Sequence, residues 1–356
     1  MREFELFISA SNSGRRQISF GRKISKGTIM QYRCVHKLLQ DFELTQKERL
    51  RIIPLNRCSL RIIQKEKKYW KLIFKKFYNY LYHEKKYYDN YVSSVFRVIK
   101  AFFRYLTLDK SIVTGDFYKS LRVPAENFSP AILTPKQLKF LIFDYNFENS
   151  LAPSLKRTKD IFVFGCTVGL RYKDLLNLKY TNLQVIDGEH FLNINTQKTG
   201  AEVRIGLPDY AISILKKYKP ISGGYILPRL SNTNLNLQVK DLIRKAGWDY
   251  YMPKIRHRQG MSVEIKNNKG ESFRFYHHIT THTMRRTAIT SLLMLGLEEH
   301  IVRKISGHAP GSKEFYRYVN ISQDYLSTKL KMIHKKLIEA YFLFPPSVFY
   351  LVRINN

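Results

Sequence analysis

Residues 281–319 read THTMRRTAITSLLMLGLEEHIVRKISGHAPGSKEFYRYV, and this stretch decides how the rest of the chain is interpreted. His282 and Arg285 are three positions apart, so a helix would place both on one face. An imidazole beside a guanidinium suits a phosphate, because arginine binds two non-bridging oxygens and histidine moves a proton near neutral pH. An HxxR pair alone is more often a chance surface pair than a site. Its meaning therefore depends on the motifs around it.

Further segments with charged or nucleophilic side chains accompany this stretch in a fixed order. They are GLRYKDLLNL at 169–178, KTGAEVRIGLP at 198–208, and ISGHAPGSKEFYRYV at 305–319. The resulting series is arginine, lysine, HxxR, glycine–histidine and tyrosine. The series carries far more information than any one of its members.

In order and spacing the series resembles the tyrosine recombinase, or phage-type integrase, family. GLRYKDLLNL is similar to the family's first-arginine box, KTGAEVRIGLP to its lysine hairpin, and residues 281–319 to its second box. The resemblance covers about residues 134–330, whereas residues 24–107 resemble the family's helical core-binding domain by pattern only. It implies a mainly α fold with a small antiparallel sheet (α+β). A SAM-like core-binding domain and a catalytic domain would together form a clamp around DNA.

The resemblance also implies catalytic roles. Arg171 and Arg285 would hold the scissile phosphate and stabilise its pentacoordinate transition state. Lys198 would protonate the leaving 5′ oxygen. His282 would assist proton transfer at the nucleophile, and His308 would donate a hydrogen bond to the phosphate.

The nucleophile is expected to be Tyr318, with Tyr316 as the second choice. Tyr316 lies eight residues after His308 and Tyr318 lies ten, and family members commonly place their tyrosine between these spacings. The run Phe315-x-x-Tyr318 matches a recurrent form of this box, in which the phenylalanine packs inward. Residues 309–312 can absorb one extra residue in the turn. Tyr325 is a third, weaker alternative.

Two neighbours of the arginines have secondary roles in this interpretation. Asp174 matches a common acidic position of the first box and is expected to orient an arginine or another active-site group. A plain place on the helix surface is the alternative. Arg286 lies about 100° around the helix from Arg285 and is expected to contact DNA or serve structure, not catalysis.

No cofactor and no metal are expected. The pair His277–His278 lacks further ligands at matched spacing. The sequence has no Walker loop and no carboxylate cluster typical of a two-metal nuclease. These features agree with strand exchange that needs neither ATP nor a divalent ion.

Composition favours a nucleic-acid partner. The chain has 356 residues, with 61 Lys and Arg against 28 Asp and Glu, which gives a net charge of +33. A field of this size attracts a polyanion, and neutralised DNA phosphates release counterions. An AT-rich genome would explain the preference for lysine but not the scarcity of acids.

Composition also excludes several other classes. Hydrophobic residues at 44% and charged residues at 25% are inconsistent with a disordered chain. Three cysteines are too few for a disulfide scaffold and favour a reduced compartment. No signal peptide is evident, and the apolar stretch 340–352 contains two prolines and is too short to span a bilayer. We therefore expect no membrane association and a cytoplasmic, nucleoid-associated protein in a bacterial cell or a phage-infected host.

The first third of the chain is predicted to be a helical DNA-binding domain. Apolar residues at helical spacing predict helices at 26–42, 65–83 and 87–106. Residues 65–91, KEKKYWKLIFKKFYNYLYHEKKYYDNY, interleave lysines with aromatics. We expect a DNA-facing helix there, and a solvated basic face is the alternative. The expected phosphate contacts are Lys65, Lys67, Lys68, Lys75 and Lys76.

The predicted domain boundaries follow changes in composition and the positions of glycine and proline. They are an N-terminal extension at 1–23, the core-binding domain at 24–107, a linker at 108–133, the catalytic domain at 134–336, and a C-terminal tail at 337–356. Catalytic-domain helices are predicted at 135–144, 155–168, 172–178, 209–217, 233–246, 283–295 and 297–306. Strands are predicted at 184–195 and 201–207, with Lys198 in the turn between them. A further hairpin at 261–275, turning at 267–270, is interpreted as either a surface insertion or a DNA contact.

These observations predict a site-specific DNA recombinase that cuts and rejoins strands through a 3′-phosphotyrosyl intermediate and a Holliday junction. The integrase of a phage or other mobile element is favoured, although a short segment before the first helix argues against an arm-binding domain. A Xer-like dimer resolvase, a DNA invertase and a catalytically silent DNA-binding protein are the alternatives. Expected partners are double-stranded DNA with specific recombination sites and a homotetramer on that DNA, with a host DNA-bending protein as a further candidate. The apolar tail is expected to dock on a neighbouring protomer, or else to fold back on its own domain.

Overall fold

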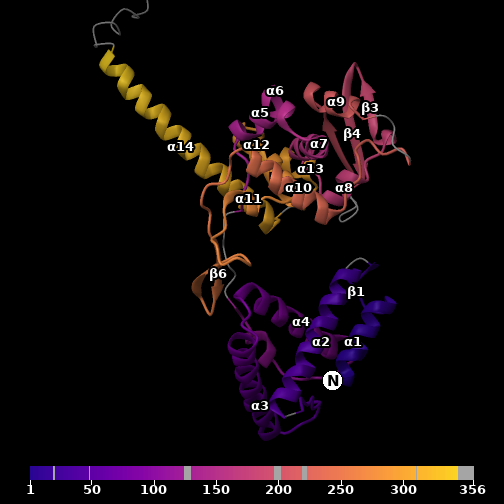
Figure 1. Ribbon diagram of the computed structural model, residues 1–356. Helices are drawn as coiled ribbons and strands as arrows, with labels where there is room; N and C mark the ends of the chain where they lie inside the picture. The colour runs from indigo at the N-terminus through magenta and orange to yellow at the C-terminus, as the bar shows by residue number, and fades with distance from the viewer. Residues whose placement is uncertain are drawn as a thin grey trace, which may run out of the picture. The chain divides into compact units, whose positions relative to one another are not determined.

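The computed structural model describes residues 1–18, 21–47, 49–123, 130–195, 202–218, 223–309 and 311–343. The chain divides into two compact units. Unit 1 comprises Met1–Phe128 and Lys254–Lys269, and unit 2 comprises Ser129–Pro253 and Gly270–Asn356. Figure 1 shows their elements. The fold is mainly helical with small antiparallel sheets, which confirms the predicted class.

Unit 1 is built on helices whose apolar residues recur at helical spacing. They are α1 (Arg2–Ser13), α2 (Lys26–Gln46), α3 (Leu60–Asn79), the π-helical turn η2 (Tyr80–Glu84) and α4 (Asp89–Leu108). Ser25 fixes the start of α2 by accepting a hydrogen bond from the Thr28 backbone N–H. The three helices predicted for this region are present, each within a few residues of its expected bounds.

Helix α1 corrects the expectation that residues 1–23 are an extension preceding the first helix. Phe4 and Phe7 of α1 are buried in the unit 1 core, where their rings lie 4.5 Å from Phe102 and 4.6 Å from Tyr32 respectively. The apolar stripe of α1 is short, and only its contacts with α2 and α4 show that it belongs to the core. Strands β1 (Gln17–Ile18) and β2 (Arg22–Lys23) pair antiparallel after it.

The segment after α4 also differs from the predicted linker at 108–133. It forms the short helix η3 (Phe117–Ser120), and the Phe117 ring stacks on Trp70 with centroids 5.0 Å apart. Tyr118 and Leu121 are buried in the same core. Unit 1 therefore keeps a packed structure through residue 123, and residues 124–129 lie outside the described part of the chain.

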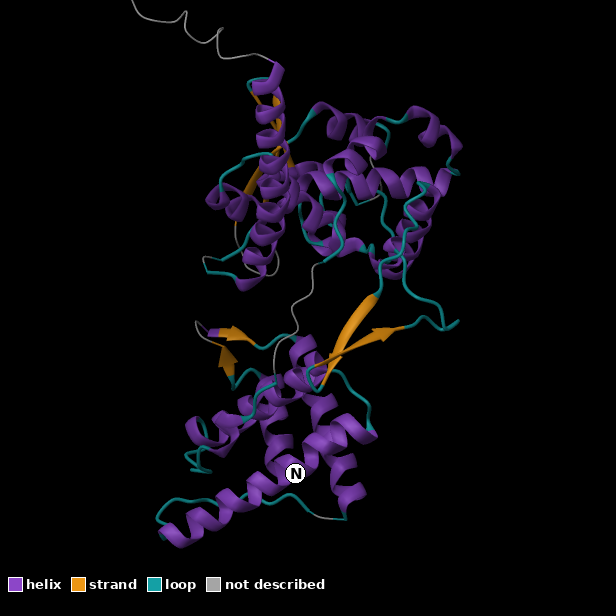
Figure 2. Cartoon of the chain, turned by 90° about the vertical axis from the view of Figure 1, so that its left-hand side faces the viewer, coloured by secondary structure: helices purple, strands orange, loops and turns teal. Residues whose placement is uncertain are grey.

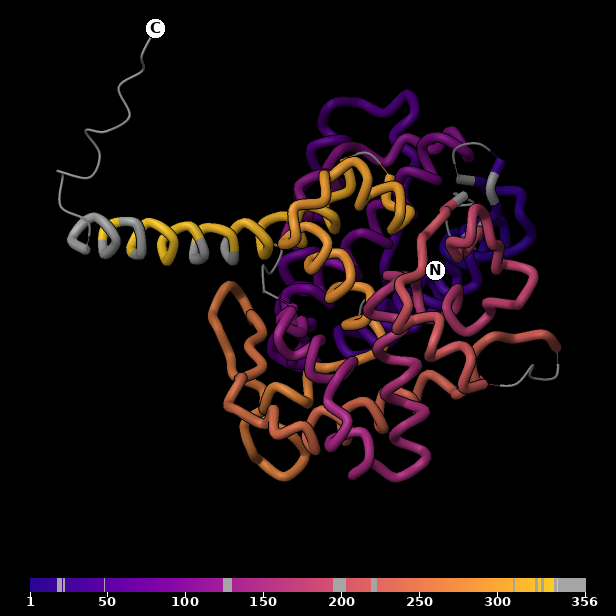
Figure 3. Tube along the Cα trace, turned by 90° about the horizontal axis from the view of Figure 1, so that it is seen from above, coloured from indigo at the N-terminus to yellow at the C-terminus, as the bar shows by residue number. Residues whose placement is uncertain are grey.

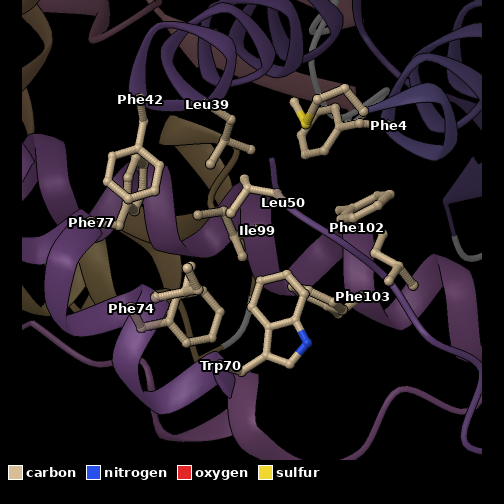
Figure 4. A pocket seen from close by; sticks show the side chains of 13 residues that line it. Phe4, Leu39, Phe42, Leu50, Trp70, Phe74, Phe77, Ile99, Phe102 and Phe103 are labelled. Carbon is tan, nitrogen blue, oxygen red and sulfur yellow. The ribbon is translucent and has the colours of Figure 1, made fainter. Parts of the chain in front are cut away.

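The aromatic core of unit 1 encloses a small apolar cavity of about 40 Å³. Phe4, Leu39, Phe42, Trp70 and Ile99 are among its lining side chains (Figure 4). A lining this apolar offers water few polar partners. We interpret it as a packing gap between large rings rather than as a binding site.

Helix α3 buries one apolar stripe and exposes most of its lysines. Trp70, Ile73 and Phe77 are buried in the core. Of the predicted DNA contacts, Lys65, Lys67, Lys68 and Lys75 are exposed and Lys76 is half-buried.

Unit 2 is organised around the buried helix α7. Its helices are α5 (Pro135–Phe143), α6 (Tyr145–Ser150), α7 (Pro153–Val168), α8 (Tyr172–Leu176), α9 (Asp209–Lys216), α10 (Asn232–Lys245), α11 (Phe275–His278), α12 (Thr281–Met294), α13 (Glu299–Ser306) and α14 (Lys313–Leu343). Thr134 and Gln137 form the capping box that starts α5, as the Thr-Pro sequence predicts. α7 packs against α5, α9, α10 and α12.

A three-stranded antiparallel sheet completes unit 2. It consists of β3 (Leu183–Ile186), β4 (Glu189–Asn195) and β5 (Glu202–Gly206), with Leu183 opposite Leu192 and Phe191 opposite Gly206. The single strand predicted at 184–195 is in fact two strands, because Asp187 and Gly188 adopt positive φ and turn the chain. Residues 196–201, including Lys198, lie outside the described residues.

The hairpin in this region is not the one predicted at 261–275. Its strands are β6 (Lys254–Arg258) and β7 (Met261–Ile265), drawn as orange arrows in Figure 2. The chain turns at Gln259–Gly260, not at residues 267–270, because Gln259 and Gly260 both have positive φ. The hairpin also belongs to unit 1 although its neighbours in sequence belong to unit 2, which the sequence pattern did not indicate.

Helix α14 projects away from the remainder of unit 2 (Figures 1 and 3). Among the described residues, no helix has the combined length and apolarity needed to cross a membrane.

Close packing of α7 on α12 depends on Gly165. A Cβ added at Gly165 would lie 2.5 Å from Met284 Sδ and 3.1 Å from Met284 Cβ. We expect Gly165→Ala to lower the free energy of unfolding by about 1–3 kcal/mol, because the two helices must move apart. The exposed helical Gly27, which has only Ser25 Oγ nearby at 3.9 Å, is the matched control. Gly27→Ala should stabilise by about 0.5–1 kcal/mol, and urea unfolding measures both changes. Equal effects of the two substitutions would contradict this packing argument.

Candidate active site

Unit 2 contains a cavity of about 530 Å³ in which residues from the separate sequence motifs meet. Its lining residues are Arg171, Tyr172, Lys173, Asp174, His282, Arg285, His308, Glu314 and Tyr318. The structure therefore brings together five of the six predicted catalytic residues, and the sixth, Lys198, lies outside the described residues.

The two arginines are positioned by different parts of the fold. Gly169 ends α7 in the left-handed conformation with φ 65°, and Arg171 then lies at the N-cap position of α8. Arg285 extends from the middle of α12. The turn at Gly169 lies close to α12, since a Cβ added at Gly169 would be 3.2 Å from Ala288 Cβ.

Arg285 is held by backbone carbonyls. It is 2% exposed, and its Nη1 donates to Gly169 O at 3.0 Å while its Nη2 donates to Ser306 O at 2.5 Å. These carbonyls lie at the C-terminal ends of α7 and α13, where the helix dipole is negative and favours a cation. Burial and the charge of Arg171 lower the pKa of Arg285 to about 10, so the side chain remains charged at neutral pH. The guanidinium is thus fixed in place before any substrate binds.

Arg171 has an unmet hydrogen-bonding need. Its Nη1 is buried and has no hydrogen-bond partner among the described residues. An unpaired buried donor on a cation is costly, and a bound anion would remove that cost. Two arginines on one cavity, one with a spare donor, suit the oxygens of a phosphodiester.

His308 adjoins the fixed guanidinium. Its Nε2 lies 3.2 Å from Arg285 Nη2, and its Nδ1 lies 2.7 Å from Ser306 Oγ. Burial and the charges of Arg285 and Arg171 lower the pKa of His308 to about 3, so its ring is neutral at pH 7. The Ser306 hydroxyl donates to Arg303 O at 3.3 Å, so its oxygen can accept from the Nδ1–H of His308, and Nε2 then carries the lone pair that faces the Arg285 donor.

His282 is also neutral at pH 7. Burial and the positive charges of Arg286 and Arg285 lower its pKa to about 4, although its side chain remains partly open to solvent. A neutral imidazole can accept a proton, which is the role predicted for this residue.

The structure distinguishes between the two candidate tyrosines. Tyr318 is 5% exposed and lines the cavity, with its ring centroid 5.9 Å from that of His308. Tyr316 is 47% exposed and is not among the cavity-lining residues. Phe315 is fully buried beneath them, as the sequence pattern predicts. Burial raises the pKa of Tyr318, so its hydroxyl keeps its proton until a base removes it.

Three further charged residues lie at or near the site and influence its electrostatics. The positive charge of Arg286 opposes the rise in the pKa of Tyr318, so Arg286 acts electrostatically on the site from which it was expected to be separate. Asp174 is buried in the cavity wall, and its charge favours the charged form of Arg285. Glu314 was not predicted. Its position four residues before Tyr318, on the same face of α14, is the sequence feature that indicates it.

The described residues contain no group of three or more His, Cys, Asp or Glu side chains arranged to hold a metal ion. His277 and His278 serve local structure instead. His277 Nδ1 accepts from the Arg274 backbone N–H, and His278 Nε2 lies 2.7 Å from Met252 O.

The neutral histidines make stability depend on pH. The native state keeps His282 and His308 unprotonated well below their ordinary pKa of 6.5, while the unfolded chain takes up protons near that value. The free energy of unfolding should therefore decrease as the pH falls from 6.5 toward 5, before most carboxylates titrate. Urea unfolding of a His282→Asn, His308→Asn double variant should show a flatter dependence in this range. Equal slopes in the wild type and the double variant would contradict the assignment of neutral rings.

Comparison with known proteins agrees with this site. Residues 132–324 match the model of the phage integrase family. A curated tyrosine recombinase of Thermosipho africanus is 26% identical over 222 residues, which cover 62% of this chain and 66% of that protein. The match thus spans just under two thirds of the relative's length.

Solved structures with a similar fold have low sequence identity. XerH recombinase bound to a palindromic difH substrate has a TM-score of 0.56 at 13% identity, over 93% of this chain and 95% of that chain. A lambda integrase dimer bound to a COC′ core site has a TM-score of 0.52 at 16% identity, over 89% and 94%. Tn1549 transposon integrase bound to transposon right end DNA has a TM-score of 0.52 at 16% identity, over 90% and 93%.

Identities this low indicate a shared fold and nothing further. The family model, however, matches more than half of the chain, which confirms the resemblance seen in the motifs. The protein belongs to the phage integrase family.

Proposed function

We propose that the protein is a site-specific DNA recombinase that cuts and rejoins strands through a 3′-phosphotyrosyl intermediate. The observation that carries this proposal is the cavity in which Arg285, fixed by two carbonyls, faces a second arginine with a spare donor, two neutral histidines and a buried tyrosine. The net charge of +33 supplies the attraction for DNA.

The first chemical step is attack of Tyr318 Oη on the scissile phosphorus. Arg171 and Arg285 bind the non-bridging oxygens and stabilise the extra negative charge of the transition state. His282 accepts the phenolic proton as the bond from oxygen to phosphorus forms. The bond to the 5′ oxygen breaks, and Lys198 gives that oxygen a proton.

Rejoining reverses these transfers. A 5′ hydroxyl attacks the phosphotyrosine, gives up its proton, and releases Tyr318, which regains its own proton. One phosphodiester is exchanged for a phosphotyrosyl ester and then recovered. The chain's own side chains therefore suffice for the proton movements, with no ATP.

We assign the partner as double-stranded DNA carrying specific recombination sites. Four exposed lysines of α3, Lys65, Lys67, Lys68 and Lys75, suit its phosphates, and half-buried Lys76 is the weakest of the proposed contacts. The similar structures of XerH and lambda integrase were determined on DNA, one of the latter as a tetramer on a Holliday junction. By analogy we propose a homotetramer that exchanges strands through such a junction.

The biological role proposed is integration for a phage or other mobile element, in the cytoplasm at the nucleoid. Dimer resolution and inversion use the same chemistry and are the second candidate. A host DNA-bending protein is a proposed accessory for the integrase role.

The C-terminal tail has a proposed role in assembly. Helix α14 runs to Leu343, beyond the tail's expected start at residue 337, and residues 344–356 lie outside the described residues. Leu330, Met332 and Ile333 of α14 are exposed apolar side chains. We propose that this segment docks on a neighbouring protomer, since so many apolar groups disfavour solvent.

Covalent trapping tests the function. Nicked duplexes tiled from the DNA that flanks the gene are incubated with the protein without Mg²⁺, and an adduct that resists SDS is sought by gel electrophoresis. We expect an adduct whose peptide, sequenced by mass spectrometry, carries the nucleotide on Tyr318. Tight binding without any adduct would favour the catalytically silent DNA-binding protein instead.

A further inference from the structure

The turn of the β6–β7 hairpin rests on a buried carboxylate of unit 1. Asp89, the first residue of α4, is 1% exposed. Its Oδ1 accepts from the Gln259 backbone N–H at 2.8 Å, and its Oδ2 accepts from that of Gly260 at 2.9 Å. Oδ1 also accepts from the Tyr82 hydroxyl at 2.6 Å. Burial and the Asp89 carboxylate raise the pKa of Tyr82, so its hydroxyl remains a donor.

The hairpin turn has the backbone shape that this contact requires. Gln259 and Gly260 have φ values of 54° and 80°, so their consecutive N–H groups point outward together. Two adjacent backbone donors match the two oxygens of one carboxylate. Without the hairpin, the buried carboxylate would lose two of these three donors, which is unfavourable.

Arg258 and Gln259 of the hairpin make further contacts with the segment that precedes Asp89. Arg258 Nη2 donates to Lys86 O at 2.8 Å, and the guanidinium lies 4.8 Å from the Tyr88 ring centroid. Gln259 Nε2 lies 3.4 Å from His83 Nε2. Residues 82–89 thus form a docking seat for the hairpin turn.

The chain segments on either side of the hairpin are paired with each other within unit 2. The Phe275 backbone N–H donates to Tyr250 O at 2.9 Å, and the two rings stack with centroids 4.8 Å apart. The Met252 N–H donates to Phe273 O at 3.2 Å. The later of the two segments leads into α11 and then into α12, which carries His282 and Arg285.

We infer that residues 254–269 are a clasp by which the catalytic part of the chain holds unit 1, with Asp89 as its latch. The clasp adds a second attachment to the covalent connection at Phe128–Ser129. Its effect on DNA binding rests on the proposed function. A second attachment restricts the orientations that the units sample, so less entropy is lost when both bind one DNA site.

Limited trypsin digestion of the free full-length protein tests the clasp without DNA. Asp89→Asn keeps the side-chain shape but places an amide NH₂ against a backbone N–H, so the turn should release. We expect cleavage after Arg256 and Arg258 to become about tenfold faster, because local opening exposes the hairpin. Asp116→Asn is the matched control, since Asp116 is an exposed acid of unit 1 paired with Lys119 at 2.6 Å. Equal cleavage rates for Asp89→Asn and the control overturn the clasp.

A second variant guards against a folding defect at the start of α4. Tyr82→Phe leaves Asp89 in place and removes one of its three donors. Its cleavage rate should lie between those of wild type and Asp89→Asn, with helical circular dichroism unchanged. A rate equal to that of wild type in this variant counts against the latch.

Measurements of DNA affinity distinguish the effect of losing the clasp from the effect of removing one negative charge by Asp89→Asn. Loss of an acid alone should tighten binding, as we expect for Asp116→Asn. Asp89→Asn should instead weaken binding, by about tenfold, to the flanking-DNA duplex that the wild type binds most tightly. Faster cleavage with undiminished affinity would overturn the link between clasp and DNA binding. A wild-type protein that does not bind DNA would contradict the proposed function and leave the digestion result standing.

Discussion

Tyr318→Phe is expected to abolish covalent attachment to DNA and to lower strand cleavage by at least about 10³-fold. The substitution removes only the hydroxyl. The ring of Tyr318 packs with Ile289, Val302 and Phe315 in a small core, and phenylalanine preserves that packing. Loss of activity therefore reports on the nucleophile and not on the fold. Quantitative SDS gels with a nicked duplex measure the effect, and DNA affinity should remain at the wild-type value.

Tyr316→Phe is the matched control for this result. Tyr316 is exposed and absent from the cavity wall, so its loss should leave cleavage within about threefold of the wild type. Persistent adduct formation by Tyr318→Phe, with the nucleotide found on Tyr316, would transfer the role to Tyr316 and preserve the family chemistry.

Arg285→Lys should produce the second large effect, a loss of cleavage of about 10²–10⁴-fold. The charge is retained, but the planar fork is not. Arg285 already donates to Gly169 O and Ser306 O and must also bind the phosphate. One ammonium group cannot satisfy both carbonyls and hold two phosphate oxygens in a fixed plane.

Measuring DNA affinity and the cleavage rate separately shows whether Arg285→Lys impairs the chemical step rather than binding. Affinity for DNA should change by less than about fivefold, because binding is distributed over many phosphate contacts. Single-turnover cleavage at saturating DNA then isolates the loss in the chemical step. Arg244→Lys, at an exposed arginine of unit 2 paired with Asp241, should show no loss. Wild-type cleavage by Arg285→Lys would refute the proposed phosphate contact.

Local sequence determines many helices of both units, although not α1, and the residues that can perform the chemistry. Helical spacing of apolar residues predicts α2, α3 and α4, because one buried stripe suffices to define a helix. The capping box at Thr134 and the left-handed Gly169 are likewise determined within a few residues of chain. The ordered motifs name Arg171, His282, Arg285 and His308 before any contact is known.

Tertiary structure decides which of these residues share an environment. Arg285 is fixed by carbonyls 116 and 21 residues away, and no local pattern contains those partners. The lowered pKa values of His282 and His308 likewise arise from burial together with neighbouring charges. Tyr318 and Tyr316 have the same residue type, and only their depth in the structure distinguishes them.

The hairpin and helix α1 show most clearly which features cannot be predicted from local sequence. The sequence determines that a turn-forming segment exists near residues 261–275, yet Asp89 contacts Gln259 and Gly260 across 170 and 171 positions. The sequence of helix α1 resembles an extension, and only the packing of its phenylalanines on Phe102 and Tyr32 shows that it belongs to the core. Periodicity and motif order are local properties, and they determine the family, the helices and the chemistry. Burial and long-range hydrogen bonds depend on chain topology. The fixed position of Arg285, the different burial of Tyr318 and Tyr316, and the proposed clasp can therefore be recognised only in the folded molecule.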